Sequence, residues 1–98
     1  MYQQIIVKKI IKNCFSTFSA RLIFILISKN DFCTRKELLK WTGFSVITIS
    51  KYLQEFSKAG LINQAPGIIY LSKFGDKIFE DLMDLLKYEE KVAQKLLR

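Results

Sequence analysis

Polar and basic side chains recur at helical spacing between Ser45 and Lys58. Lys51, Gln54 and Lys58 follow one another at intervals of three or four residues, so they share one face of a helix. The ammonium group of Lys51 can pair with a phosphate or donate to guanine acceptors, and the amide of Gln54 can pair with adenine through two hydrogen bonds. This face is therefore a candidate surface for binding a nucleic acid.

Residue types that carry catalysis and metal binding are scarce. The chain has no histidine, two cysteines (Cys14 and Cys33) and four glycines that form no phosphate-binding loop. Without histidine, a histidine-based general base or catalytic triad is excluded, and two cysteines cannot complete the usual four-ligand structural zinc site. We expect no enzyme activity, metal or cofactor, although carboxylate or lysine chemistry stays open. A disulfide between the two cysteines also stays open.

Positive charge is concentrated in the first three-fifths of the chain. Residues 1–60 hold ten Lys/Arg and three Asp/Glu, whereas residues 61–98 hold six of each, so the net charge of +7 lies entirely in the first part. A localised basic excess favours a polyanionic partner, either a nucleic acid or an anionic membrane surface. The plainer alternative is that the positive charge serves only to keep the chain soluble.

The apolar pattern argues against a membrane span. The longest apolar run, residues 22–27, has six residues, whereas a span needs about 20. The N-terminal residues also lack the apolar core and small-residue cleavage site of a signal peptide. We therefore expect an intracellular, cytoplasmic protein, in a prokaryotic cell or a virus-infected host cell.

Helical spacing and capping residues predict the elements that position the basic face. Apolar residues predict a helix over residues 2–15 and a second one over residues 20–29 with Ser19 as its N-cap, although residues 21–27 would also fit a buried strand. Thr34 and Glu37 form a capping box that starts a short helix, which Gly43 ends. Ser45 caps the next helix, which runs to about residue 59.

The second half of the chain predicts a hairpin and one long helix. Residues 61–64 and 67–71 are short apolar runs on either side of a Pro-Gly turn. Ser72 caps a last helix that could run nearly to Arg98. The expected fold is mainly α with a small β-hairpin, in one domain over residues 1–98.

Two segments resemble a known family. Residues 42–62, TGFSVITISKYLQEFSKAGLI, are similar to the recognition-helix segment of winged helix-turn-helix repressors of the ArsR type. Residues 69–75, IYLSKFG, resemble the junction between wing and last helix in MarR- and PadR-type relatives. The resemblance covers roughly residues 20–80. It implies a winged helix-turn-helix fold and a sequence-specific regulator of transcription that binds double-stranded DNA.

The resemblance also implies which residues face DNA. On the helix over about residues 45–59 they are Ser45, Val46, Ile47, Ser50, Lys51 and Gln54, to which we add Lys58 from the same face. The helix before the turn crosses the DNA backbone in this motif, so we expect phosphate contacts there from Arg35, Lys36 and Lys40. The wing tip has no Lys or Arg, so Asn63 or Gln64 would have to supply any wing contact.

Val46 and Ile47 are unusual on a polar face. Their side chains either touch thymine methyl groups or pack under the N-terminal helix. The residues leave both interpretations open.

Apolar residues in the terminal helices predict a homodimer. In the last helix they recur close to heptad spacing, and the length of that helix exceeds what one small domain can cover. With residues 1–15 and 76–98 as dimerisation helices, the expected interface consists of Ile6, Ile10, Ile78, Leu82, Leu85, Val92 and Leu96.

Two other functions remain open beside DNA binding. A winged-helix domain without sequence-specific DNA binding can serve as a protein-interaction module, which an uncharged wing tip would suit. Residues 2–15 could also bind an anionic membrane surface as a basic amphipathic helix. We expect DNA, and no membrane, as the partner.

Overall fold

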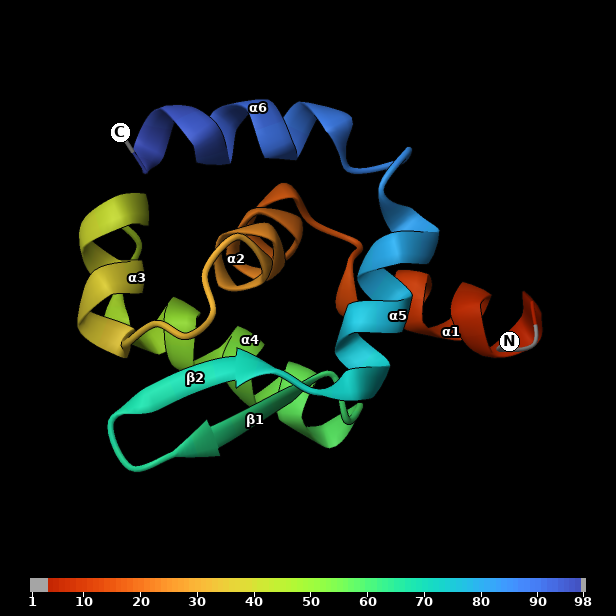
Figure 1. Cartoon of the computed structure of the whole chain (residues 1–98), viewed down its shortest axis with the longest axis horizontal. Coiled ribbons are helices and arrows are strands. Elements are labelled where there is room, and N and C mark those ends of the chain that lie inside the picture. Colours follow the sequence, from red (N-terminus) through yellow and green to blue (C-terminus); the bar gives the residue numbers. More distant parts are fainter. Residues whose placement is uncertain (1–3, 98) are drawn as a thin grey trace.

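The structure, a computed structural model, describes the backbone of residues 4–97 and the side chains of residues 8–97. This part of the chain forms a mainly α globule with one antiparallel hairpin, as expected (Figure 1). Its elements are α1 (Gln4–Cys14), α2 (Phe18–Ser28), α3 (Arg35–Thr42), α4 (Val46–Lys58), β1 (Ile62–Ala65), β2 (Ile68–Leu71), α5 (Lys73–Leu82) and α6 (Lys87–Leu96). Tyr2, the expected first residue of the N-terminal helix, lies outside the described residues.

Helix α2 occupies the centre of the fold, with α6 on one side of it and the hairpin on the other (Figure 1). Residues 22–27 are all buried, and they are helical rather than the alternative strand. The expected N-cap, Ser19, is wrong, because the helix begins earlier. Thr17 has extended backbone angles, and its hydroxyl accepts a hydrogen bond from the Ala20 amide at 3.1 Å.

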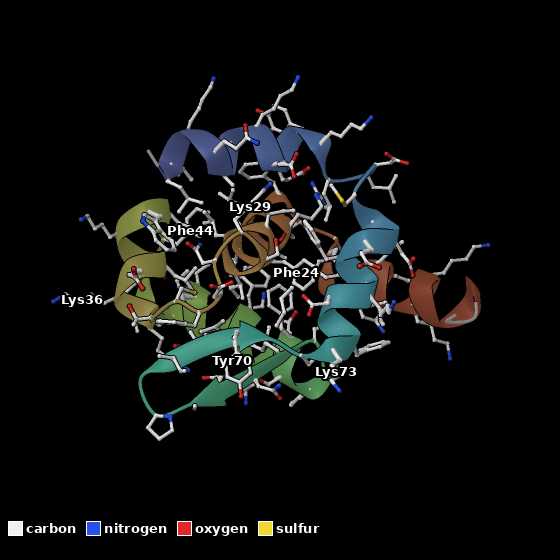
Figure 2. The ribbon with its side chains drawn as sticks, in the orientation of Figure 1. Phe24, Lys29, Lys36, Phe44, Tyr70 and Lys73 are labelled. Carbon is white, nitrogen blue, oxygen red and sulfur yellow. The ribbon has the colours of Figure 1, made fainter. Side chains whose placement is uncertain are left out.

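Four phenylalanines join the helices into one core. The ring of Phe24 in α2 lies 4.8 Å from Phe15, 5.7 Å from Phe56 of α4 and 6.3 Å from Phe79 of α5, measured between ring centroids. Figure 2 shows Phe24 in the interior, under the surrounding helices. Tilted and edge-on aromatic pairs at these separations add to the stabilisation that burial provides. The central helix therefore fixes α4, whose opposite face is the candidate site.

The hairpin is held to the segment that precedes α3. Its register pairs Ile62 with Leu71 and Ala65 with Ile68. Beyond the two strands, Cys33 and Ile69 exchange two backbone hydrogen bonds of 2.9 and 2.7 Å. Because Cys33 directly precedes the N-cap of α3, this bridge fixes the hairpin beside the start of α3.

The predicted long C-terminal helix is wrong, because the chain turns at residues 83–86. The amides of Leu85 and Leu86 both donate to the Leu82 carbonyl, at 2.9 and 3.1 Å, and α6 then runs back across α2 (Figure 1). Two ion pairs hold α6 there: Arg21 Nε lies 2.7 Å from Glu89 Oε2, and Lys29 Nζ lies 2.8 Å from Glu90 Oε2. Packing on the chain's own core thus outweighs continuation of the helix.

This turn also corrects the expected dimer seam. Ile10, Ile78 and Leu82 are buried in the chain's own core, and Val92 and Leu96 pack half-buried against it. The near-heptad series is mostly the inner face of two helices in one molecule. Leu85 alone among the described members is exposed, and the side chain of Ile6 lies outside the described residues.

Candidate nucleic-acid interface

A three-residue turn joins α3 to α4. The capping box at the start of α3 is confirmed: the Glu37 amide donates to Thr34 Oγ1 at 3.0 Å, and the Thr34 amide donates to Glu37 Oε1 at 3.0 Å. Gly43 then ends α3 with φ of 71°, a left-handed conformation that favours glycine. Ser45 caps α4 by accepting from the Thr48 amide at 3.1 Å, as predicted.

Helix α4 is amphipathic, and its polar face is the predicted one. Ile49, Leu53 and Phe56 are buried in the core. The side chains that point to solvent are those of Ile47, Lys51, Gln54, Ser57 and Lys58, with Ser50 partly covered at the edge of this face. Burial of one face fixes the helix axis, so the polar face is presented from a rigid element.

Arg35 connects α3, α4 and the hairpin through its guanidinium. Its Nη1 donates to Ser50 Oγ at 2.8 Å and its Nη2 donates to Gln64 Oε1 at 3.4 Å. Gln64 Nε2 in turn donates to Ser57 Oγ at 3.0 Å. Arg35, Ser50 and Gln64, each expected to contact DNA separately, therefore form one hydrogen-bonded network with Ser57.

Ser57 was missed in the sequence analysis. It lies three residues after Gln54 and seven after Ser50, so helical spacing alone places it on the same face. Its partner Gln64 is seven residues further along the chain, on β1. Spacing could have found the position of Ser57, but not its bond to the hairpin.

The lysines of this region are exposed. Lys36 and Lys40 on α3 and Lys51 and Lys58 on α4 all reach solvent, and Figure 2 shows the Lys36 side chain pointing away from the molecule. Lys51 Nζ lies 5.3 Å from the centroid of the Tyr52 ring, a cation–π distance that restricts where its ammonium group can go. The Tyr52 hydroxyl is itself hydrogen-bonded to Thr17 Oγ1 at 2.9 Å.

Each of α3 and α4 carries one carboxylate. Glu37 is exposed on α3, where it accepts the capping-box hydrogen bond of Thr34 and keeps its negative charge beside Lys36 and Lys40. Glu55 is partly buried, and its charge adds to burial in raising the pKa of the Cys14 thiol on α1. The exposed side chains of α4 therefore include no carboxylate, whereas Glu37 offsets part of the positive charge of α3.

Val46 and Ile47 are 62 % and 82 % exposed at the first turn of α4. This corrects the alternative in which they pack under the N-terminal helix. Two apolar side chains thus stand beside Lys51 and Gln54 on the solvent face.

The hairpin tip carries no charge. Asn63, Gln64, Pro66 and Gly67 are exposed, and Gly67 has the positive φ of 80° that the turn requires.

A cavity of about 300 Å³ lies between the hairpin and the start of α3. It is lined by Thr34, Arg35, Lys36, Gln64, Ala65, Gly67, Ile68 and Ile69. Asn63 and Gln64 are the amides nearest the tip, and Gln64 is already held in the Arg35 network.

The cysteines are free and buried. Burial, with a smaller effect of the Glu37 carboxylate, raises the pKa of the Cys33 thiol to about 12. A thiol is nucleophilic only as thiolate, so Cys33 is unreactive near neutral pH. Among the described residues, no three His, Cys, Asp or Glu side chains are grouped to hold a metal ion.

No single helix in the described part of the chain has the length and hydropathy of a membrane span. Two helical segments, Lys8–Cys14 and Phe18–Ser28, would together have the length and composition of a span, but a bend of 109° separates them.

Comparisons of this chain with models of protein families, with curated proteins and with solved structures found no match.

Proposed function

We propose that this chain is a winged helix-turn-helix protein that binds double-stranded DNA sequence-specifically and regulates transcription, with α4 in the major groove. The observation that carries the proposal is the outward face of α4. It presents Lys51, Gln54 and Lys58, which are exposed on a rigid helix, whereas Glu55, the one acidic residue of α4, is partly buried. The major groove is about 12 Å wide and admits one α-helix.

The side chains of α4 divide into two kinds of contact. Lys51 and Lys58 are cations suited to phosphate oxygens, which fix position but carry no sequence information. Gln54 is suited to adenine, whose N6 and N7 match a carboxamide. The amide end of the helix beside Ser45 favours a further phosphate, because unpaired N–H groups and the helix dipole both attract anions.

Arg35 acts in this proposal as a positioning residue. Its bonds to Ser50 and Gln64 fix the distance between α4 and the hairpin before DNA arrives. Lys36 and Lys40, which are exposed on α3, supply the phosphate contacts of that helix.

The experiment that tests the proposal is a titration of a mixed-sequence DNA duplex at several salt concentrations. We expect binding at low salt that weakens steeply as salt rises, because neutralising phosphates releases counterions. Absence of binding at low salt, or binding that does not depend on salt, would contradict it.

The exposed aliphatic side chains predict a contribution from thymine methyl groups. In a duplex obtained by selection from random sequences, we expect replacement of the thymines by uracil to weaken binding by about fourfold per contacted methyl, the equivalent of about 0.8 kcal/mol. Ile47→Ser should reduce this difference, because Ile47 is the more exposed of the pair. If the wild type binds both duplexes equally, Val46 and Ile47 do not contact thymine methyl groups.

A protein-interaction module is the second candidate. It is favoured by the uncharged hairpin tip and by Ile47, since a side chain that is 82 % exposed suits an apolar partner surface. A chain that binds no duplex at low salt would leave this candidate as the better one.

A further inference from the structure

We propose that two copies of this chain associate, in the absence of DNA, through a groove between α1 and the turn that joins α5 to α6. The groove has a volume of about 350 Å³ and lies beside the surface of α2 that bears Arg21. It is lined by Ile11 and Phe15 on one wall, by Leu82, Leu85, Leu86 and Tyr88 on the other, and by the Arg21–Glu89 ion pair. The groove lies apart from the outward face of α4.

Exposed apolar side chains surround this groove. Phe18, Met83, Leu85 and Tyr88 are 37 %, 44 %, 66 % and 67 % exposed, and they are four of the seven large apolar side chains exposed in residues 8–97. The rings of Phe18 and Tyr88 lie 5.9 Å apart, which joins the edges of α2 and α6 into one patch. Apolar residues scattered singly over a surface need no partner, but a contiguous patch indicates an interaction surface.

The two walls carry opposite charge. Lys8 and Lys12 on α1 each lie three residues before a residue of the groove, Ile11 and Phe15, and residues 1–30 contain no Asp or Glu. On the other wall, Asp81 and Asp84 directly precede Leu82 and Leu85, and residues 79–86 contain no Lys or Arg. Asp84 is paired at 3.8 Å with the exposed Lys87, whereas no ion pair among the described side chains involves Asp81, Lys8 or Lys12.

This arrangement selects a second copy of the chain as the occupant. An anionic membrane would be repelled by the aspartate wall, and an acidic peptide would match only the lysine wall. A twofold axis through the groove places the lysine wall of each copy opposite the aspartate wall of its partner. The apolar patches then face one another, and both sets of charges are paired.

Sedimentation velocity of the full chain without DNA tests the surface. We expect a dimer for the wild type, and a dimer dissociation constant raised by about tenfold or more for Leu85→Lys, since a buried apolar contact becomes a positive charge that faces the lysine wall of the partner. Leu85 is largely exposed in the single chain, so the variant should fold. The matched control is Phe32→Lys, because Phe32 is 59 % exposed but does not line the groove.

Charge reversal tests the twofold arrangement. Lys12→Glu and Asp81→Lys should each weaken the dimer alone, and an equimolar mixture should restore it, because each mixed pair regains opposite charges. A monomeric wild type, equal weakening by Leu85→Lys and Phe32→Lys, or a mixture that stays monomeric would overturn the proposal. So would a monomer that co-sediments with phosphatidylglycerol vesicles, which would make a membrane the occupant. DNA binding by a monomer would leave the proposed function intact.

Discussion

Replacing Gly75 with alanine is expected to lower the free energy of unfolding by about 3 kcal/mol, the upper range for overpacking a buried site. Gly75 is buried in the first turn of α5, and a Cβ atom there would collide with the backbone carbonyl of Leu61. The two segments are held at this distance by hydrogen bonds: the Ser72 amide donates to the Leu61 carbonyl at 3.0 Å, and the Gly75 amide donates to Ser72 Oγ at 2.9 Å. Because the obstacle is backbone, it cannot rotate away.

Urea denaturation followed by circular dichroism measures this effect. Lys77→Ala is the matched control, because Lys77 is exposed on the same helix and its ion pair with Glu80 is long at 3.9 Å. We expect Lys77→Ala to change the stability by no more than about 0.5 kcal/mol. Equal stability of Gly75→Ala and the wild type would show that α5 does not approach Leu61 this closely.

Reversing the charge of Lys51 is expected to weaken binding to duplex DNA by about 100-fold at low salt, since Lys51→Glu both removes a phosphate contact and adds repulsion. Lys51 is exposed at the middle of α4, and its position over Tyr52 pre-orients the ammonium group. Fluorescence anisotropy with a labelled duplex measures the loss.

The control for Lys51→Glu is Lys91→Glu. Lys91 is exposed on α6 and makes no ion pair among the described residues. Because both variants replace a lysine with a glutamate, they change the net charge equally. We expect a much smaller loss for Lys91→Glu. If the two variants weaken binding to the same degree, DNA is held by overall charge and α4 is not the contact surface.

Elements set by local bonds could be predicted from the sequence. The capping box of Thr34 and Glu37, the stop at Gly43 and the cap at Ser45 all appear where expected, because each depends on bonds within four residues. The polar face of α4 followed equally well from spacing. These features fix the turn and the orientation of the candidate site.

Elements that depend on distant contacts could not be predicted. Ser19 was expected to cap α2, but the helix begins after Thr17, whose hydroxyl is also hydrogen-bonded to the distant Tyr52 of α4. The turn after Leu82 lets α6 pack on α2, where Leu86 and Ala93 are buried and Glu89 and Glu90 form ion pairs, and these are contacts with distant parts of the chain. The expected dimer seam failed for the same reason.

In the candidate site too, features that depend on local spacing could be predicted, and features that depend on distant contacts could not. Which residues lie on α4's outward face followed from helical periodicity, including the exposure of Lys51, Gln54 and Lys58. The bond from Arg35 to Gln64 joins residues 29 positions apart, so no spacing rule could find it. The exposure of Val46 and Ile47 needed the placement of α1 to be known.

The central claim, that α4 and α3 form a DNA-binding surface, is tested most directly by the salt dependence of duplex binding. If Lys36, Lys40, Lys51 and Lys58 each contact one phosphate, a plot of the logarithm of the binding constant against the logarithm of the salt concentration should have a slope of about −3.6. This slope corresponds to a loss of affinity of roughly 100-fold between 50 and 200 mM salt. Lys51→Ala should reduce the magnitude of the slope by about 0.9, the value expected for one phosphate. A slope near zero, or a slope that Lys51→Ala leaves unchanged, would contradict the account.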